Sequence, residues 1–380
     1  HEARDIAFVA WKPTAGARAG APAAGGFAGR MHPRVAELFV GREDELDALR
    51  AALIEGAGPR RPVAVCALHG MPGIGKSYLV DRFAHLEAAR FPGGYHRIVL
   101  QPGEPRPATA FLGDLAELLG LTFDGGTAAR GRLAATLTSP RALLHVENVD
   151  GAPQAALAVE LAEALAGAAV AVTGRIAGLG HAAGWPQVPV RVFQEADSLE
   201  LLDAEIGPGP RPPVSELRRL AGAVGHLPLA LHLAAGHLRY GRSVERLMAK
   251  LLDSPHPDPT DPASCRDRAR SVLALTFGLS LDQLRAELGP EAPALIAGLA
   301  ALGHAPLAGV GTGLGAAMAG LSPGAFEDLA LAARSLSLVE LSDEGGRNCW
   351  RVHPLVAELL RRDPAAAGAS DRMTGWFLDR

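Results

Sequence analysis

The stretch HGMPGIGKSYLV, residues 69–80, constrains the fold more than any other part of the chain. Gly70, four further residues and then Gly75, Lys76 and Ser77 fit the GxxxxGK[ST] phosphate-binding loop. Glycines let the backbone approach phosphate oxygens closely, and a helix that begins near Lys76 would point its free N–H groups at the same anion. The apolar run RRPVAVCALHG leads into the loop, which predicts a buried strand before it. We therefore predict a nucleotide site, with Lys76 on the outer phosphates and the Ser77 hydroxyl on Mg²⁺.

Further apolar runs follow the loop and alternate with helical patterns. The runs cover residues 95–100, 141–146, 168–174 and 188–193. Ala- and Leu-rich segments such as ATAFLGDLAELLGL and AALAVELAEALAG separate them. Strands that alternate with helices form crossover units and a parallel sheet, so we predict an α/β P-loop domain over residues 35–195.

The second half of the chain is helical in pattern. Apolar residues at helical spacing predict a small all-α domain over residues 196–255, and a linker rich in Pro and Asp follows it. Helices near 266–285, 291–302 and 323–335, then a β-hairpin formed by SLVEL and NCWRV, predict a winged-helix domain over residues 256–362. We interpret residues 1–34 as a flexible linker and residues 363–380 as an extension towards a possible sensor region.

Two further strand ends carry residues suited to nucleotide chemistry. Glu147 follows the apolar run LLHV and is predicted to hold Mg²⁺ through a water. The next residue, Asn148, cannot accept a proton from an attacking water, so we expect slow ATP hydrolysis unless Asp150 or another residue substitutes. Thr173 and Arg175 end the next strand, and carboxyl ends of parallel strands gather at the ligand edge. Arg175 is therefore predicted to contact the γ-phosphate.

Six motifs occur in a fixed order along the chain: FVGREDEL, GMPGIGKS, LLHVEN, VTGR, GHLPLAL and RVHPLV. Together they resemble the STAND class of signalling NTPases, and more narrowly the NB-ARC module of plant resistance proteins, the apoptosome ATPase and bacterial NLR-like regulators. The resemblance extends from Val35 to Leu360. It implies an AAA+-like P-loop domain that is followed by a helical domain and a winged-helix domain.

The resemblance also implies roles for particular residues. The VGR segment would lie at the adenine side of the pocket, Pro228 would close over the base, and His353 would contact the β-phosphate of bound ADP and lock the closed form. Pro354 follows this histidine where plant members have Asp, and the metal-side motif is Glu-Asn where the family has Asp-Asp. Lys76, Glu147 and Arg175 would be the catalytic residues, and Ser77 and Glu147 the magnesium ligands. The full nucleotide-binding set is Val40, Gly41, Arg42, Gly70, Met71, Gly73, Ile74, Gly75, Lys76, Ser77, Tyr78, Pro228 and His353.

The function that the resemblance implies is an ATP/ADP switch. An ADP-locked monomer would convert to an ATP-bound homo-oligomer and activate an effector in signalling or immune defence, such as defence against phage. Hydrolysis would reset the switch. Effector and sensor domains would lie outside this segment, because the chain begins at His1 and reads as a piece of a longer bacterial protein.

Two other classes of enzyme remain open on the residues alone. An AAA+-like motor or loader with a winged helix, acting on a protein or on DNA, would share the phosphate loop, whereas a small-molecule kinase would need a second pocket. The net charge of −4 and the mixed helix GAFEDLALAARSLSL argue against DNA binding. No run reaches the roughly 20 apolar residues of a membrane span. Cys66, Cys265 and Cys349 are far apart, which favours a reducing cytoplasm.

Overall fold

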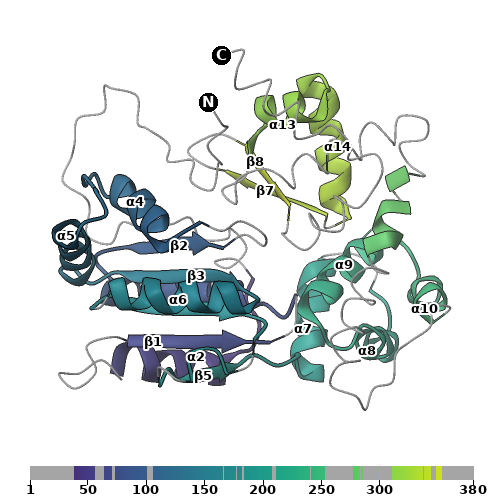
Figure 1. Cartoon of the computed structure of the whole chain (residues 1–380). Coiled ribbons are helices and arrows are strands. Elements are labelled where there is room, and N and C mark those ends of the chain that lie inside the picture. The colour runs from purple at the N-terminus through teal and green to yellow at the C-terminus, as the bar shows by residue number, and fades with distance from the viewer. Residues whose placement is uncertain are drawn as a thin grey trace. The chain divides into compact units, whose positions relative to one another are not determined.

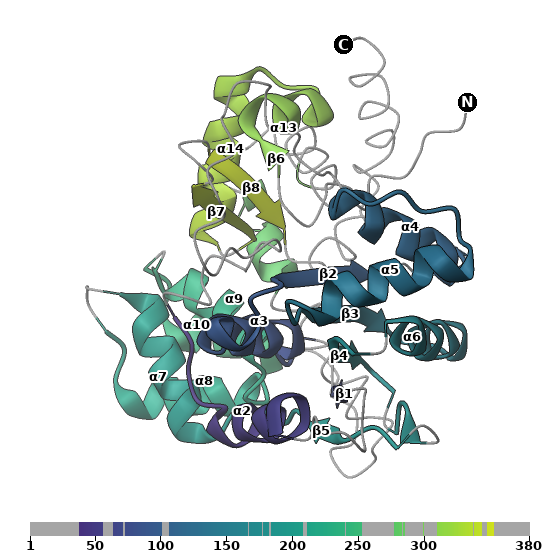
Figure 2. The same cartoon turned by 90° about the vertical axis from the view of Figure 1, so that its left-hand side faces the viewer.

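The computed structural model divides the chain into two compact units, with the boundary between Arg191 and Val192. Figures 1 and 2 show the helices and strands of each unit, and each unit has its own buried residues. The structure describes residues 38–55, 64–70, 73–100, 106–165, 167–176, 178–181, 184–207, 211–239, 241–252, 277–282, 284–285, 299, 310–336, 338–343 and 348–352. The predicted segments 1–34 and 363–380, Met71, His353 and the hairpin turn at 344–346 therefore lie outside the described residues.

A five-stranded parallel sheet forms the centre of the first unit, which comprises the described residues from 38 to 191. Its strands are β1 (Ala64–His69), β2 (Tyr95–Val99), β3 (Leu143–Val149), β4 (Ala169–Gly174) and β5 (Gln187–Pro189). They lie in the order β2-β3-β4-β1-β5, and every pairing is parallel. The predicted α/β class with a parallel sheet is confirmed. Because β4 lies between β1 and β3, the carboxyl ends of these three strands meet at one edge.

Helices cover both faces of this sheet. They are α2 (Glu43–Arg50), the π-helical turn η1 (Ala51–Glu55), α3 (Lys76–Leu86), the 3₁₀ turn η2 (Ala88–Arg90), α4 (Ala108–Leu118), α5 (Thr127–Thr138) and α6 (Ala152–Ala164). Figure 2 shows α4, α5 and α6 on one side of the sheet and α2 and α3 on the other. Leu112, Leu133 and Leu161 from the first group share a core with the apolar sheet residues Val146 and Val172.

Two details of the first unit differ from the sequence expectation. The strand expected over 188–193 has only the three residues of β5, at the edge of the sheet, where Pro189 lacks the N–H that a longer ladder needs. Helix α5 was not predicted, although Leu133 and Leu137 stand at helical spacing and are fully buried. Neither difference alters the edge that carries the phosphate loop.

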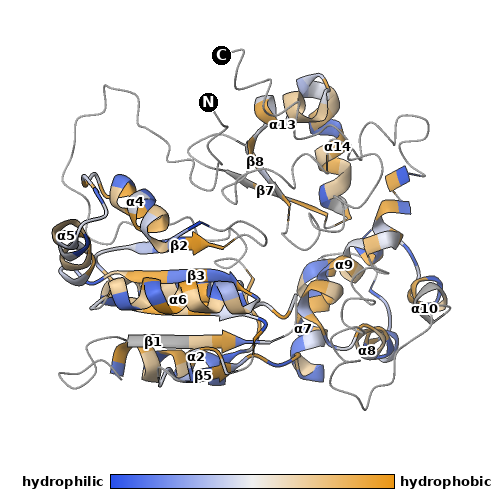
Figure 3. Cartoon of the chain, in the orientation of Figure 1, coloured by the Kyte–Doolittle hydropathy of each residue, from blue (hydrophilic) through white to orange (hydrophobic). Residues whose placement is uncertain are grey.

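The second unit contains two groups of elements in its described part. The first is helical: α7 (Glu195–Ile206), α8 (Val214–Ala223), α9 (Pro228–Arg239) and α10 (Val244–Leu252). A capping box of Gln194 and Asp197 fixes the start of α7. Figure 3 shows hydrophobic and hydrophilic segments mixed along α7, whose buried residues are Ser198, Leu202, Glu205 and Ile206.

The second group joins helices to an antiparallel sheet. It consists of β6 (Val310–Gly311), α13 (Thr312–Ala319), α14 (Pro323–Ser335), β7 (Val339–Asp343) and β8 (Asn348–Val352), with the strand order β6-β8-β7. Helix α14 coincides with the expected helix 323–335, whereas α13 was not predicted. The assignment of a helical domain to 196–255 and of a winged helix to 256–362 stays a prediction. In the described part of the chain, no helix is both long and apolar enough to cross a membrane.

Candidate functional site

The phosphate loop connects β1 to α3, as the motif predicts. Gly73 and Gly75 have φ angles of 74° and 95°, in the left-handed region that other residues avoid. A Cβ atom on Gly70 would lie 2.6 Å from the carbonyl oxygen of Val190, so this position has no room for a side chain. Lys76 begins α3 and its Nζ donates to the carbonyl oxygen of Gly70 at 3.0 Å. This hydrogen bond joins the amine that is expected to meet the phosphates to the first glycine of the loop.

The environment of Lys76 is largely buried. Burial lowers the pKa of this amine to about 8, although the negative charge of Asp150 opposes the shift. An incoming phosphate would favour the charged form of the amine, as any close anion does. Burial therefore lowers the pKa of this amine, and a bound phosphate would raise it again.

The VGR segment lies beside this loop. Gly41 and Arg42 have positive φ angles of 61° and 77°, and Arg42 precedes the first turn of α2. Its guanidinium donates to the carbonyl oxygen of Ile74 at 3.1 Å and pairs with Glu45 at 2.8 Å. Val40 is buried. The structure therefore brings the predicted adenine-side segment against the phosphate loop, and its contact with adenine stays a prediction.

The metal side of the site is formed by Ser77 and Glu147. The Ser77 hydroxyl donates to Glu147 Oε1, and Arg97 Nη2 donates to Oε2 at 2.5 Å. Burial alone would raise the pKa of Glu147, but the positive charge of Arg97 and the hydrogen bond from Ser77 lower it to about 2. The carboxylate is therefore ionised at neutral pH. Glu147 also lies within β3, which continues to Val149, whereas the sequence placed it after the strand.

This donor set fits Mg²⁺. A hydroxyl and an ionised carboxylate side by side are hard oxygen ligands, which Mg²⁺ prefers. No group of three or more His, Cys, Asp or Glu side chains suited to a metal ion occurs among the described residues. A Mg²⁺ ion here would take its remaining ligands from phosphate oxygens and water, as it usually does in nucleotide sites.

A bulge follows Glu147. The pairing of β3 with β4 shifts between Val146 and Val149, and Asn148 within it has a φ angle of 63°. Asparagine tolerates this left-handed conformation better than most residues. The two strand ends come very close here, because a Cβ on Gly174 would lie 2.0 Å from the carbonyl oxygen of Val149. Asn148 is thus the left-handed residue of a β-bulge, and its side chain is an amide.

Asp150 and Arg175 follow β3 and β4 and meet. The backbone N–H of Arg175 donates to Asp150 Oδ1 at 3.0 Å, and its guanidinium pairs with Oδ2 at 2.7 Å. Both side chains are partly buried and both influence the charge of Lys76. The predicted γ-phosphate sensor and the alternative acid therefore form one ion pair beside the phosphate loop.

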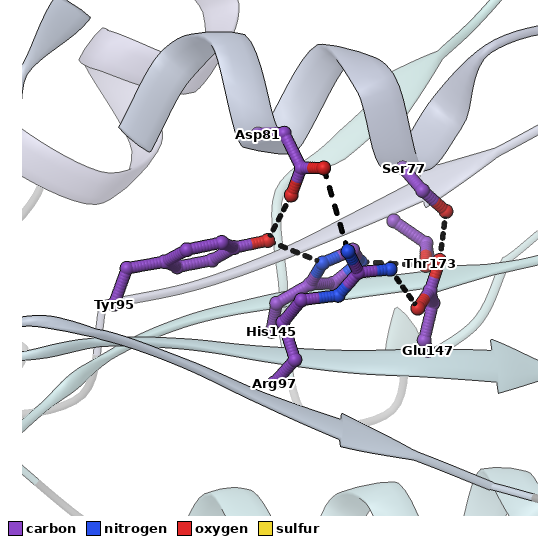
Figure 4. Close-up of polar contacts among 7 residues, drawn as sticks. All are labelled: Ser77, Asp81, Tyr95, Arg97, His145, Glu147 and Thr173. Atoms are coloured by element: carbon purple, nitrogen blue, oxygen red, sulfur yellow. Dashed lines mark hydrogen bonds and ion pairs between the residues drawn. The ribbon is translucent and has the colours of Figure 1, made fainter. Parts of the chain in front are cut away.

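Sequence reasoning missed a buried polar network beneath this site (Figure 4). The Tyr95 hydroxyl donates to Asp81 at 2.6 Å, so it must accept from His145 Nδ1, which is 2.8 Å away. His145 Nε2 is then unprotonated and accepts from the Thr173 hydroxyl at 2.9 Å. Burial keeps this histidine neutral by lowering its pKa to about 4. Thr173, expected at the ligand edge, is used here as a partner inside the unit.

The described residues do not test two of the predicted contacts. Pro228 begins α9 in the second unit, where its fixed φ and missing N–H suit the first turn of a helix. Its contact with a base stays a prediction, as does the role of His353, which is outside the described residues. Tyr78 lies in the first turn of α3 and is partly buried.

Comparison with known proteins relates this geometry to a family. The chain is 30% identical over 372 residues to the regulatory protein AfsR of Streptomyces coelicolor, covering 91% of this chain and 35% of that protein. AfsR of Streptomyces griseus is 29% identical over 336 residues, covering 85% and 32%. The chain thus spans about a third of the length of these relatives.

A solved structure shares the fold. It is a signal transduction ATPase with numerous domains (STAND) from Pyrococcus horikoshii, with a tetratricopeptide repeat sensor. The TM-score is 0.55 at 15% identity, over 90% of this chain and 46% of that one. A model of the AAA ATPase domain matches residues 38–260, more than half of the chain and all five strands of the parallel sheet. The chain therefore belongs to the AAA ATPase domain family.

Proposed function

We propose that this chain is an ATP/ADP-binding molecular switch of the NB-ARC (STAND) type, in which nucleotide exchange, and not repeated hydrolysis, produces the output. One observation carries the proposal. Ser77, beside Lys76 at the start of α3, contacts the predicted metal-side acid Glu147, whereas Asn148 follows that acid with an amide where a general base would be needed.

The acids near the site are arranged for binding a nucleotide and are poorly suited to its hydrolysis. Glu147 is engaged by Ser77 and Arg97, and Asp150 is engaged by Arg175. A general base must accept a proton from the attacking water, and an amide cannot do so. Asp150 could serve only by loosening its ion pair with Arg175. We therefore expect hydrolysis that is slow and suited to resetting a switch.

The similar proteins support a regulatory role. The two Streptomyces relatives are named regulatory proteins, and the structural neighbour is named a signal transduction ATPase with a separate sensor. Each is longer than the part this chain matches. We propose that this segment is likewise the cytoplasmic switch of a larger regulator whose effector and sensor lie in other segments, with signalling or defence as the output.

The proposed switch uses a lid from the second unit. With ADP bound, Pro228 would contact the base and His353 the β-phosphate, which keeps the protein monomeric. ATP would displace the histidine, and the freed surface would allow self-association. ATP can favour the open form only by the ratio of its affinities for the two forms, so a change from 1:99 to 99:1 requires a ratio of about 10⁴.

Nucleotide content tests the proposal directly. The purified protein is denatured, and the released nucleotide is identified by chromatography and compared with the protein concentration. We expect close to one ADP per chain, and much less from Lys76→Ala. Arg132→Ala is the matched control, because it removes a cation from the exposed surface of α5 in the same unit.

Two further readouts separate the switch from a motor. Light scattering should show a monomer with ADP and an oligomer with ATP. A protein that carries no nucleotide, and hydrolyses ATP over many cycles with stimulation by DNA or a protein client, would instead identify an AAA+-like motor or loader.

A further inference from the structure

Arg97 connects two buried carboxylates next to the phosphate loop. Its Nη2 atom lies 2.5 Å from Glu147 Oε2, and its Nη1 atom lies 3.4 Å from Asp81 Oδ2. The exposed fractions of the side chains are 19% for Arg97, 8% for Glu147 and 2% for Asp81. Salt has little effect on ion pairs that are this buried, so Arg97 is a permanent part of the electrostatics of the site.

Three elements place these charges together (Figure 4). In the parallel pairing of β2 with β3, Arg97 is opposite His145 and Val99 is opposite Glu147. Helix α3 contributes Ser77 and Asp81, which are four residues apart and share one face of the helix. Arg97 thus reaches across from β2 to the metal-side acid and to the helix that begins at the phosphate loop.

The contacts assign a separate donor to each oxygen of Glu147. Ser77 holds Oε1 and Arg97 holds Oε2, so the carboxylate is fixed beside the hydroxyl that would ligate Mg²⁺. The same guanidinium cancels the charge by which a carboxylate attracts Mg²⁺. Orientation of the acid and reduction of its charge therefore come from one side chain.

We propose that Arg97 is a positioning residue that holds Glu147 against Ser77 and reduces the negative charge offered to Mg²⁺, so that ADP stays bound with little dependence on Mg²⁺. This inference rests on the proposed nucleotide switch and adds how that switch holds ADP. A site that retains ADP without a tightly bound metal keeps its closed state when Mg²⁺ levels change. ATP, with one more phosphate group to neutralise, gains more from Mg²⁺ than ADP does.

Substitution of Arg97 should increase the effect of Mg²⁺. In Arg97→Gln the full charge of Glu147 faces the metal, so Mg²⁺ should bind more tightly and slow the release of ADP. Loss of one partner of a buried ion pair can also prevent folding. The charge-balanced variant Asp81→Asn/Arg97→Gln avoids this, because it removes one charge of each sign while the new amide oxygen can still accept from the Tyr95 hydroxyl.

The experiment measures the release of labelled ADP from the full chain after a chase with unlabelled ADP, in EDTA and in excess MgCl₂. The readout is the rate of ADP release in EDTA divided by the rate in excess MgCl₂. We expect this ratio to rise about tenfold over wild type in Arg97→Gln and in the double variant. It should stay within about twofold in Arg97→Lys, which keeps the charge, and in the control Arg106→Gln, which breaks the ion pair of Arg106 with Asp114 elsewhere in the unit.

The outcomes distinguish failure of the proposed role of Arg97 from failure of the proposed nucleotide switch. A purely structural role for Arg97 would speed ADP release equally with and without Mg²⁺ and leave the ratio unchanged. An unchanged ratio in the folded variants, or an equal rise in Arg97→Lys, overturns the inference while the switch proposal stands. Failure of the wild-type protein to bind ADP overturns both.

Discussion

The hydroxyl of Tyr95 offers a test of the buried network, because Tyr95→Phe removes one oxygen and keeps the ring. Tyr95 is 1% exposed, and its hydroxyl donates to the Asp81 carboxylate at 2.6 Å and accepts from His145 at 2.8 Å. The hydrogen bond to the charged Asp81 carboxylate contributes about 1.5–3 kcal/mol to stability. Removing the hydroxyl also leaves the buried N–H of His145 without its acceptor, which costs about 1 kcal/mol more. We expect a loss of about 3 kcal/mol in the stability of the first unit.

Hydrogen exchange of the amides in β2 and β3 is the appropriate assay, since the chain has two units and one unfolding curve would mix them. A loss of about 3 kcal/mol corresponds to exchange roughly 100-fold faster for the most protected amides of Tyr95–Val99 and Leu143–Val149.

Thr136→Val is the matched control. It also removes a hydroxyl from the first unit, but that group donates to the Arg132 carbonyl at 2.9 Å on the surface of α5. Exchange should change there by about twofold at most, because surface substitutions alter stability by about 0.5 kcal/mol or less. If Tyr95→Phe has as small an effect as this control, the hydroxyl does not link Asp81 to His145 and the deduced proton positions are wrong.

Three further predictions concern the first unit. Lys76→Ala should weaken ADP binding about 10- to 100-fold by calorimetry, because it removes a charge-assisted contact. Gly70→Ala should cost the first unit about 1–3 kcal/mol, measured by hydrogen exchange of the most protected amides of β1, since its Cβ meets the Val190 carbonyl, whereas Gly131→Ala, with open space around it, should gain about 0.4–1 kcal/mol. Burial lowers the pKa of His96, so the unfolded chain binds a proton before the folded one does as pH falls below 6.5. Stability should therefore drop between pH 7 and pH 5, and His96→Gln should reduce that drop.

The parts that sequence predicted are those with a local pattern. The phosphate loop follows from glycine spacing, and the strand that contains Glu147 and the strand that precedes Arg175 follow from short apolar runs, so the structure places both residues near the expected edge. Helix α5 has a weaker signal, because Ala, Gly and Thr separate its buried leucines. It could have been found from Leu133 and Leu137, four residues apart.

The buried network could not be predicted in the same way. Arg97 reaches Glu147 because β2 lies next to β3, and it reaches Asp81 because α3 packs on the same sheet, over β3 and β4. Neither the strand order nor the helix packing can be read from the sequence that flanks any one of these residues. The local hint was the presence of polar or charged residues, among them His96, Arg97 and His145, inside runs that read as buried strands. The bulge at Asn148 is equally invisible, since its cause is the approach of another strand.

The strand order has a consequence for how the protein is made. Among the strands that the structure describes, β1, which leads into the phosphate loop, pairs with β4 and β5 alone, and its first partner, Ala169, comes about 100 residues later in the chain. β2 and β3 leave the ribosome before it can pair. At 5–20 residues per second, synthesis of the missing partner takes roughly 5–20 s, during which β1 has no neighbour in the sheet. The strand that leads into the predicted phosphate loop thus waits longest for its partners, although it is the first strand of the sheet to be translated.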